Sequence, residues 1–287
     1  MRIVIIGSTG QLGTDLKETL QATDEVIGLK HQDIEVTDYN SCLKLKEHRP
    51  DIIINTAAFH KTDQCEDEPL KAFSVNAIGA RNVALVSKEI NATTVYIGTD
   101  YVFDGTKTEA YNEEDKPNPI NTYGISKLAG EFFTKQNPKH YITRIASLFG
   151  VAGASGKGGN FVETMITKAK KNEPISVVND MWISPTYTKD AATAIQKIMK
   201  QNATYGTYHI TNKGLCTWFE FTKEILNQTH LTPSLTAMRT DQQQYRARRP
   251  KFSALTSTKL SKHGIKMPEW KDALHRYLIE KKYIKTF

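Results

Sequence analysis

The stretch RIVIIGSTGQLG, residues 2–13, decides the fold of this chain. A short run of β-branched residues ends at once in three glycines, Gly7, Gly10 and Gly13. The residues that follow carry leucines at four-residue spacing, which is typical of a helix with one buried face. The stretch therefore predicts a buried strand, a tight turn and a helix in direct succession.

This strand–turn–helix context is the one that a dinucleotide-binding turn requires. Gly7 makes the turn, Gly10 lets the backbone approach a pyrophosphate, and Gly13 lets the helix pack closely on the strand. The helix N-terminus adds free N–H groups and a positive dipole end. The spacing is G-x-x-G-x-x-G rather than the more familiar G-x-G-x-x-G. A tight turn that binds no ligand is the alternative, and the neighbouring strand and helix favour the binding interpretation.

Predicted strands and helices continue to alternate along the rest of this part of the chain. Strands are predicted at EVIGL, DIIINTAA, TTVYIGT and HYITRIASLFG, with helical patterns between them. This order predicts an α/β, Rossmann-like, doubly wound parallel sheet. We expect an NAD(P)-binding domain over 1–150, with later returns to the sheet near 175–200, where ISVVND is the candidate strand. Residues 151–287, which open with the glycine-rich VAGASGKGGN, are expected to form mainly a smaller substrate-binding lobe.

Composition and charge argue against a membrane protein, a secreted disulfide-rich protein and a nucleic-acid-binding protein. No segment reaches the roughly 18 apolar residues that a membrane span needs, and the N-terminus lacks the pattern of a secretory signal. Three scattered cysteines argue against a disulfide framework and for the cytoplasm. From Arg239 onward there are 13 Lys or Arg against 4 Asp or Glu, a surplus of nine within a total charge of +7. Because aromatics are not interleaved with these cations, we expect no nucleic-acid partner. We also expect no membrane partner and interpret most of these cations as a solvated basic face.

The stretch YGISK places Tyr123 and Lys127 four residues apart, on one face of a predicted helix. This helix follows the strand that ends at Thr99, at the edge of the sheet where ligands bind. A tyrosine is a weak acid at neutral pH, and a neighbouring ammonium is expected to lower its pKa. Thr99 can donate a hydrogen bond to a carbonyl oxygen. The same spacing recurs at Tyr277 and Lys281, which we interpret as accidental.

The end of the second predicted strand bears on the cofactor. An NAD site tends to place an acid there to hold the ribose 2′-hydroxyl. This chain has Lys30, beside His31, and a cation suits a 2′-phosphate. We therefore expect NADPH, with NADH as the alternative.

The motifs together carry a family resemblance. GSTGQLG, INTAAFHKTDQCEDEP, AFSVNAIGARNVA, GTDYVFDG, YGISKLAGE, GGNFVETM, SPTYTKDAA, GTYHITNKG and ARRPKFSALTSTKL run over nearly the whole chain. The sequence resembles the extended short-chain dehydrogenase/reductase family, and within it the dTDP-4-dehydrorhamnose reductases. The resemblance implies a catalytic triad of Thr99, Tyr123 and Lys127. It implies cofactor contacts from these last two side chains and from Gly7, Thr9, Gly10, Gln11, Leu12, Gly13, Lys30, Glu35, Val36, Ala58, Phe59 and His60.

The resemblance also implies a substrate site, and two departures bear on it. The implied contacts are Thr99, Asp100, Leu148, Asn160 and Arg249. Leu148 stands where the family commonly has a tryptophan that packs against the sugar, which leaves the identity of the sugar open. The second departure is a histidine at position 60, where a threonine is usual.

Metal binding is not expected. His60, Asp63 and Cys65 match no standard zinc spacing. Some relatives bind Mg²⁺ between subunits through acidic residues, and Asp15 and Asp180 could echo such a site. We predict no metal ligand and leave Mg²⁺ open.

The leading hypothesis is an NADPH-dependent reductase of the C4 keto group of a nucleotide-linked 4-keto-6-deoxy sugar. The expected reaction takes dTDP-4-dehydro-L-rhamnose to dTDP-L-rhamnose for surface polysaccharide. A reductase of another nucleotide sugar is one alternative. A non-catalytic NADP-binding regulatory subunit of the methionine adenosyltransferase beta type is another. The sequence leaves the oligomeric state open, with a homodimer as one candidate.

Overall fold

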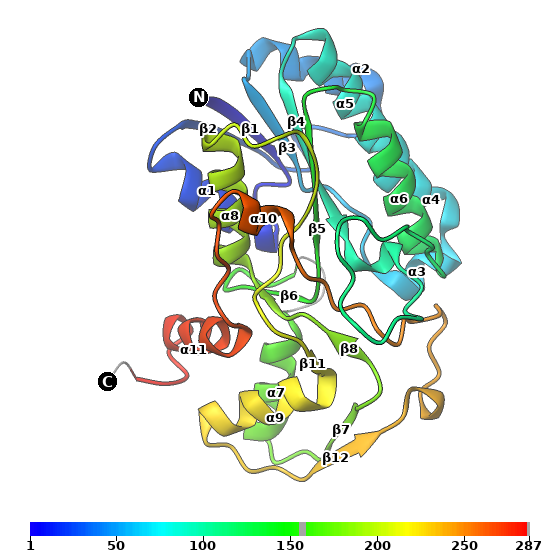
Figure 1. The fold of residues 1–287 in the computed structure, drawn as a ribbon, viewed down its shortest axis with the longest axis vertical. Coiled ribbons are helices and arrows are strands. Elements are labelled where there is room, and N and C mark those ends of the chain that lie inside the picture. The colour runs from blue at the N-terminus through cyan, green and yellow to red at the C-terminus, as the bar shows by residue number, and fades with distance from the viewer. Residues whose placement is uncertain (155–158, 286–287) are drawn as a thin grey trace.

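A computed structural model describes residues 1–154 and 159–285 of the chain (Figure 1). Its main feature is a six-stranded sheet in the order β10-β5-β4-β3-β1-β2, in which every neighbouring pair is parallel. The strands are β1 (Arg2–Ile6), β2 (Glu25–Leu29), β3 (Ile52–Asn55), β4 (Thr93–Thr99), β5 (His140–Ile145) and β10 (Gly206–His209). This is the doubly wound, Rossmann-like sheet that the alternating pattern predicts.

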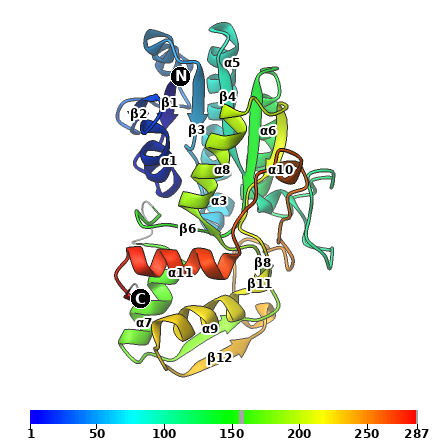
Figure 2. The same cartoon turned by 60° about the vertical axis from the view of Figure 1, so that its left-hand side comes forward.

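Helices cover both faces of this sheet (Figures 1 and 2). On one face α1 (Gln11–Gln21) packs against α8 (Thr188–Lys200). The opposite face carries, in chain order, α2 (Tyr39–Leu43), η1 (Lys44–His48), α3 (Thr62–Asp67), α4 (Pro69–Phe73), η2 (Ser74–Ile78), α5 (Gly79–Glu89) and α6 (Thr122–Thr134). The short helix η3 (Asp100–Val102) continues β4 directly. Because both faces are covered, the strands are apolar on both sides.

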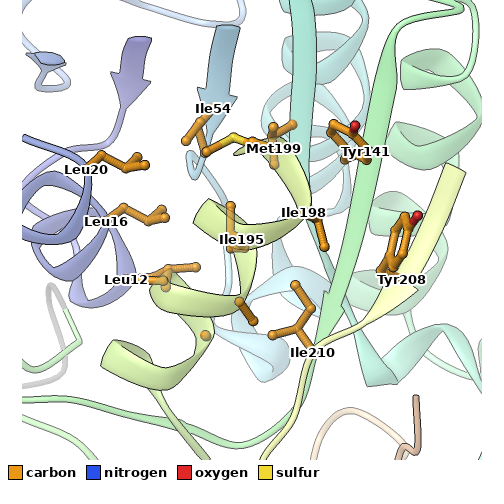
Figure 3. Packing of buried hydrophobic residues seen from close by; sticks show 14 of the residues in the cluster. Leu12, Leu16, Leu20, Ile54, Tyr141, Ile195, Ile198, Met199, Tyr208 and Ile210 are labelled. Carbon is orange, nitrogen blue, oxygen red and sulfur yellow. The ribbon is translucent and has the colours of Figure 1, made fainter. Parts of the chain in front are cut away.

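Alternate residues of β1 enter the two cores that this arrangement creates. Ile3 and Ile5 belong to the cluster beneath α1 and α8, and Val4 and Ile6 belong to the cluster beneath α2 and α5. Figure 3 shows the first cluster, which joins Leu12, Leu16 and Leu20 of α1 to Ile195, Ile198 and Met199 of α8. Each fully buried Leu or Ile stabilises the fold by about 1.5–3 kcal/mol.

A second lobe follows residue 149 and has a core of its own. Its elements are β6 (Leu148–Phe149), α7 (Phe161–Lys170), β7 (Ile175–Val178), β8 (Trp182–Ile183), β9 (Thr186–Tyr187), β11 (Cys216–Thr217), α9 (Trp218–Thr229), β12 (Leu235–Met238), η4 (Thr240–Gln242) and α11 (Trp270–Glu280). The short helix α10 (Lys259–Lys262) instead packs on β10 of the large sheet. Phe149, Phe221 and Tyr277 belong to a cluster whose residues all come from position 149 onward. The separate core supports the predicted division near residue 150, which stays a prediction.

One expected strand lies elsewhere. ISVVND was expected to return to the large sheet, but β7 pairs with β12 in a separate two-stranded sheet. Within 175–200 it is helix α8 that covers the large sheet, and β10 joins the sheet at residues 206–209. The predicted glycine-rich loop over 151–160 includes residues 155–158, which lie outside the described residues.

Several cations of the basic C-terminal segment form ion pairs within the chain. Arg276 contacts Asp190 and Asp272, Arg249 contacts Asp63, and Lys281 contacts Glu163. These acids lie in earlier parts of the chain, apart from Asp272. The uneven charge along the sequence is therefore partly balanced by contacts between distant segments. Among the described residues, no helix is long and apolar enough to cross a membrane.

Candidate active site

A cleft of about 1370 Å³ lies at the carboxyl edge of the large sheet. Ile6, Thr99 and Ile145, which end β1, β4 and β5, line it, as does Thr56 after β3. Ligands bind at this edge in doubly wound sheets because the loops that follow the strands meet there. Of the residues expected to contact the cofactor or the substrate, all but Arg249 line this cleft.

The glycine turn is shaped by close backbone contacts. Gly7 has φ +78°, in the left-handed region that favours glycine. A Cβ at Gly13 would lie 2.2 Å from the Gly7 carbonyl oxygen, so only glycine lets α1 begin this close to β1. The backbone N–H groups at the start of α1 consequently face the cleft, where they can bind an anion. Within the described part of the chain, the buried Oε1 of Gln11 has no hydrogen-bond partner, and its Nε2 donates to the Leu148 carbonyl at 3.3 Å.

Lys30 and Glu35 lie at the adenosine end expected for a dinucleotide. Lys30 is exposed and lines the cleft after β2. Glu35 accepts hydrogen bonds from the backbone N and the Oγ1 of Thr37, at 2.9 and 2.8 Å, and the backbone bond most strongly lowers the pKa of its carboxyl. Glu35 is therefore a charged side chain bound to its own loop, which leaves Lys30 as a cation available to a phosphate.

Thr99, Tyr123 and Lys127 meet in the middle of the cleft. Thr99 ends β4, whereas Tyr123 and Lys127 both come from the first half of α6. The Thr99 hydroxyl donates to Asp100 Oδ1 at 3.1 Å and forms a hydrogen bond with the Tyr123 side chain. Gly124 makes this possible, since a Cβ there would lie 2.1 Å from the Tyr101 carbonyl oxygen. The helix can therefore bring Tyr123 against the end of β4.

Burial dominates the proton affinity of Tyr123. It raises the pKa of this phenol well above its ordinary value, and the Thr99 hydrogen bond opposes the shift only in part. The expectation that Lys127 lowers this pKa is wrong for this structure. The Lys127 ammonium instead donates to the Ile97 carbonyl oxygen at 2.6 Å and lies 4.1 Å from the centre of the Tyr96 ring.

Lys127 is itself strongly affected by burial. Its side chain is 2 % exposed, and desolvation lowers its pKa to about 7, an effect that the negative charge of Glu131 opposes. Glu131 lies one helical turn further along α6 and forms a buried ion pair with Arg144 of β5, at 2.9 and 2.7 Å. Lys127 therefore changes charge close to neutral pH.

Asp100 is a second titratable group beside the triad. Burial raises the pKa of its carboxyl to about 6, while hydrogen bonds from Ser253 and Thr99 act in the opposite direction. The residue directly follows β4, so its carboxyl reaches the same cleft as Thr99.

Of the expected substrate contacts outside the triad, Leu148 and Asn160 line the cleft and Arg249 does not. The Asn160 Nδ2 donates to the Gly150 carbonyl and the Tyr277 hydroxyl, and its Oδ1 accepts from the Glu163 N–H. Its amide thus caps α7. Arg249 lies outside the lining, where its Nη2 donates to Asp63 at 2.7 Å and its guanidinium lies 6.0 Å from the Tyr101 ring.

The second Tyr-x-x-x-Lys pair has a structural role. Tyr277 is fully buried in the core of the second lobe, and its hydroxyl donates to Glu163. Lys281 forms an ion pair with the same carboxyl at 3.6 Å. Neither residue lines the cleft.

The described residues contain no group of three or more His, Cys, Asp or Glu side chains that could hold a metal ion. Asp15 accepts from Thr188, and Asp180 accepts from the backbone N–H of Thr240 at 2.9 Å. The two carboxyls thus have separate partners, in the first domain and in the second lobe. Mg²⁺ binding through a second subunit stays untested.

Sequence reasoning missed several residues of the site. The Tyr101 ring meets the Tyr123 ring edge-on, with 5.9 Å between their centres. Asn76 is fully buried and binds both backbone groups of Phe59, at 2.8 and 3.0 Å. It lies in η2, a π-helical turn, and a polar residue inside an otherwise apolar helix was the available signal. Phe161 and Trp218 form an aromatic pair on the second-lobe side of the cleft, with 4.4 Å between ring centres.

Comparison with known proteins identifies the family. The model of the family described as RmlD substrate binding domain matches residues 1–283. The chain belongs to this family. Among curated relatives, the spore coat polysaccharide biosynthesis protein SpsK of Bacillus subtilis is 38 % identical over 98 % of both chains. The dTDP-4-dehydrorhamnose reductase of Salmonella typhimurium is 32 % identical, again over 98 % of both chains.

Solved structures of dTDP-4-dehydrorhamnose reductases have the same fold. A dTDP-4-dehydrorhamnose reductase from Bacillus anthracis, in complex with NADP, matches with a TM-score of 0.92 at 41 % identity and covers 97 % of this chain and 99 % of its own. A second such reductase, from Clostridium acetobutylicum, has a TM-score of 0.93 at 38 % identity and covers 98 % of this chain and all of its own. Both comparisons span the large sheet and the second lobe together, which places the chain with the extended short-chain dehydrogenases/reductases.

Proposed function

We propose that this chain reduces the C4 keto group of dTDP-4-dehydro-L-rhamnose with NADPH and yields dTDP-L-rhamnose. The observation that carries the proposal is the meeting of Thr99, Tyr123 and Lys127 in one cleft with the glycine turn. The relatives named dTDP-4-dehydrorhamnose reductase support the substrate, and the NADP complex of the Bacillus anthracis protein supports the cofactor. The unpartnered Gln11 Oε1 and the exposed Lys30 fit a dinucleotide with a 2′-phosphate.

The chain's own residues would supply positioning and the proton. A bound reduced nicotinamide supplies a hydride to the carbonyl carbon. Thr99 donates a hydrogen bond to the carbonyl oxygen and stabilises the negative charge that develops there. Tyr123 then gives its phenolic proton to that oxygen, which completes the alcohol and leaves a phenolate.

The raised pKa of Tyr123 suits this direction of reaction. A phenol that holds its proton tightly is fully protonated before the hydride arrives. Lys127, one helical turn away, would hydrogen-bond the nicotinamide ribose and so help to hold the cofactor beside the phenol. The raised pKa therefore keeps Tyr123 in the protonated form that reduction of a ketone requires near neutral pH.

A different nucleotide sugar is the second candidate, and Leu148 is the observation that favours it. Leucine offers the sugar less surface than tryptophan, and the aromatic pair of Phe161 and Trp218 lies on the second-lobe side of the same cleft. The relative named for spore coat polysaccharide biosynthesis supports a role in making a surface polysaccharide. Three buried free cysteines and this use of a nucleotide sugar support a cytoplasmic location.

Exposed apolar side chains support a homodimer. Phe73, Ile78, Ile125 and Phe132 are between 37 and 61 % exposed and come from adjacent helices of one face of the molecule. Ile125 and Phe132 are two helical turns apart on α6, so they share one side of it. Sedimentation of wild type and Phe132→Glu checks this, since a dimer through this face should become a monomer in the variant. A monomeric wild type contradicts it.

The function is tested by steady-state turnover with dTDP-4-dehydro-L-rhamnose, followed by the loss of reduced nicotinamide absorbance. A UDP-linked 4-keto-6-deoxy sugar serves as the competing substrate in a parallel reaction. We expect kcat/KM to be higher for the dTDP sugar. A preference for the UDP sugar would favour the second candidate, and binding of NADPH without turnover of either sugar would favour a regulatory subunit.

A further inference from the structure

Helix α3 joins two distant parts of the chain at the mouth of the site. One is the first turn of α6, which carries Tyr123. The other is the segment 239–251, here named the strap, which runs from β12 of the second lobe back toward α3 (orange in Figure 1). The residues of α3 that make these contacts are the acids Asp63, Glu66 and Asp67, and none of them belongs to the cofactor turn or to the triad.

Asp63 holds the strap. Its Oδ1 accepts the backbone N–H of Ala247 at 3.0 Å, and its Oδ2 accepts from Arg249 Nη2 at 2.7 Å. The Arg249 side chain is only 13 % exposed, so this charge-assisted contact is partly desolvated. Asp67, one helical turn further on, pairs with Arg246 of the same strap. A carboxylate that binds both a backbone N–H and a guanidinium fixes the position of a loop more firmly than either bond alone.

Glu66 holds the start of α6. Its two oxygens accept the backbone N–H and the hydroxyl of Thr122, at 2.8 and 2.7 Å. That N–H belongs to the first helical residue and has no partner inside the helix. A negative charge at this end is also favourable to the helix dipole. The side chain of Asn121, which caps α6, donates to the Arg248 carbonyl at 2.8 Å and so ties the same turn directly to the strap.

The strap reaches Tyr123 through one aromatic ring. The Arg249 guanidinium lies 6.0 Å from the centre of the Tyr101 ring, and Tyr101 meets Tyr123 edge-on. Gly105 lets its own loop approach the strap closely, since a Cβ there would lie 2.7 Å from the Lys251 backbone nitrogen. The strap, α3 and the first turn of α6 therefore form one packed unit.

We propose that Asp63 and Glu66 are positioning residues that couple the second lobe to the proton donor. Asp63 fixes Arg249 and the strap, and Glu66 fixes the turn from which Tyr123 projects. The proposal rests on the proposed function only for its kinetic consequence. Loss of Asp63 loosens the strap and should weaken productive substrate binding, whereas loss of Glu66 loosens the proton donor itself and should slow the chemical step.

Kinetics separate these two roles. For Asp63→Asn we expect KM for the sugar nucleotide to rise about tenfold or more, as loss of a charge-assisted contact implies, with a smaller change in kcat. For Glu66→Ala we expect kcat to fall about tenfold with KM nearly unchanged. NADPH affinity should stay within about twofold in both, because neither side chain lines the cofactor turn. Glu68→Gln is the matched control, since this α3 cap residue pairs with Lys71 and not with the strap.

A double-mutant cycle tests the coupling across the ion pair. Asp63→Asn and Arg249→Gln should each raise KM, and the double variant should be no worse than the poorer single variant. If the increases in KM of the two single variants added up in the double variant, the role of Asp63 would be overturned. If Asp63→Asn failed to bind NADPH, Arg249→Gln alone would carry the test, because it removes the same pair from the strap.

Hydrogen exchange tests the positioning without any substrate. In Glu66→Ala the Thr122 amide should exchange about tenfold faster, and in Asp63→Asn the same should hold for the Ala247 amide. Glu68→Gln should change neither amide. Unchanged exchange in both acidic variants would overturn the proposal even if the enzyme is active. Faster exchange in a protein that turns over no sugar nucleotide would leave the positioning intact and count against the proposed function instead.

Discussion

Tyr123 and Lys127 are the residues on which the proposed chemistry depends most directly. They share α6, yet burial acts on them in opposite directions: it raises the pKa of the phenol and lowers that of the ammonium. Burial removes the water that would stabilise a phenolate or an ammonium, so the neutral phenol and the neutral amine are both favoured. A proton donor and a switchable cation thus lie side by side at the end of β4.

Tyr123→Phe should abolish most turnover. Removal of a positioned proton donor typically costs about 10²–10⁴-fold in rate, whereas the ring that packs against Tyr101 is kept. We expect NADPH affinity within about twofold of wild type, measured by fluorescence titration. Tyr277→Phe makes the same change in the second Tyr-x-x-x-Lys pair and should keep turnover. Full activity in Tyr123→Phe would remove this residue as the proton donor.

The pH dependence follows from Lys127. Its pKa of about 7 means that the ammonium is present below neutral pH and is lost as the pH rises. Since kcat/KM reports the free enzyme, we expect it to fall above about pH 7, tenfold per pH unit at the limit. In Lys127→Met, the small activity that remains should lack this fall. A kcat/KM that increases from pH 7 to 9 would contradict the assignment.

Cofactor preference should depend on Lys30. Its cation suits a 2′-phosphate, and an acid at the end of β2 suits a ribose hydroxyl. For Lys30→Asp we expect the ratio of kcat/KM for NADPH over NADH to fall by about tenfold or more. Lys44→Asp makes the same charge change at an exposed position of η1, and the ratio should stay as in wild type. An unchanged ratio in both variants would exclude Lys30 from recognition of the phosphate.

Among elements, the turn between β1 and α1 is the most tightly constrained. Gly13 lies against the Gly7 carbonyl so closely that any side chain must push the helix away from the strand. Leu12, Leu16 and Leu20 project from the same helix into the core, so a displaced α1 disturbs packing as well as the site.

Gly13→Ala should therefore destabilise the fold. A Cβ at 2.2 Å from backbone cannot be accommodated by a side-chain rotation, and we expect a loss of about 1–3 kcal/mol in the free energy of unfolding. Gly10→Ala is the comparison, because its Cβ would lie 3.2 Å from the same oxygen and should cost less. Urea unfolding measures the free energy of unfolding of both variants. Equal stability of Gly13→Ala and wild type would show that α1 can move freely.

For whole elements, local pattern predicted the large sheet but not every strand in it. Each of the first five strands is a short apolar run with a turn or a helix on each side, and this pattern can be recognised in the sequence. ISVV has the same pattern yet pairs with β12, because pairing partners depend on contacts between distant segments. GTYH, which does join the sheet as β10, carries too few apolar residues to be recognised locally.

Across the whole molecule, functional residues were predictable where one motif carries them, and they were not predictable where the fold brings distant segments together. The glycine turn and the Tyr123–Lys127 pair each lie within one short stretch of sequence. The contact between Asp63 and Arg249 joins residues 186 positions apart, and no spacing reports it. The pKa of Lys127 also depends on the burial of its ammonium against the Tyr96 ring, which the sequence does not show.

The central claim is that this cleft transfers a hydride from the nicotinamide to C4 of a dTDP-linked 4-keto sugar. The most direct test uses NADPH carrying deuterium at the transferred position, with dTDP-4-dehydro-L-rhamnose, and locates the label by NMR. We predict that wild type places one deuterium on C4 of dTDP-L-rhamnose and that Tyr123→Phe forms almost no labelled product. A product labelled at another carbon, or no labelled sugar while NADPH is bound, would contradict the account.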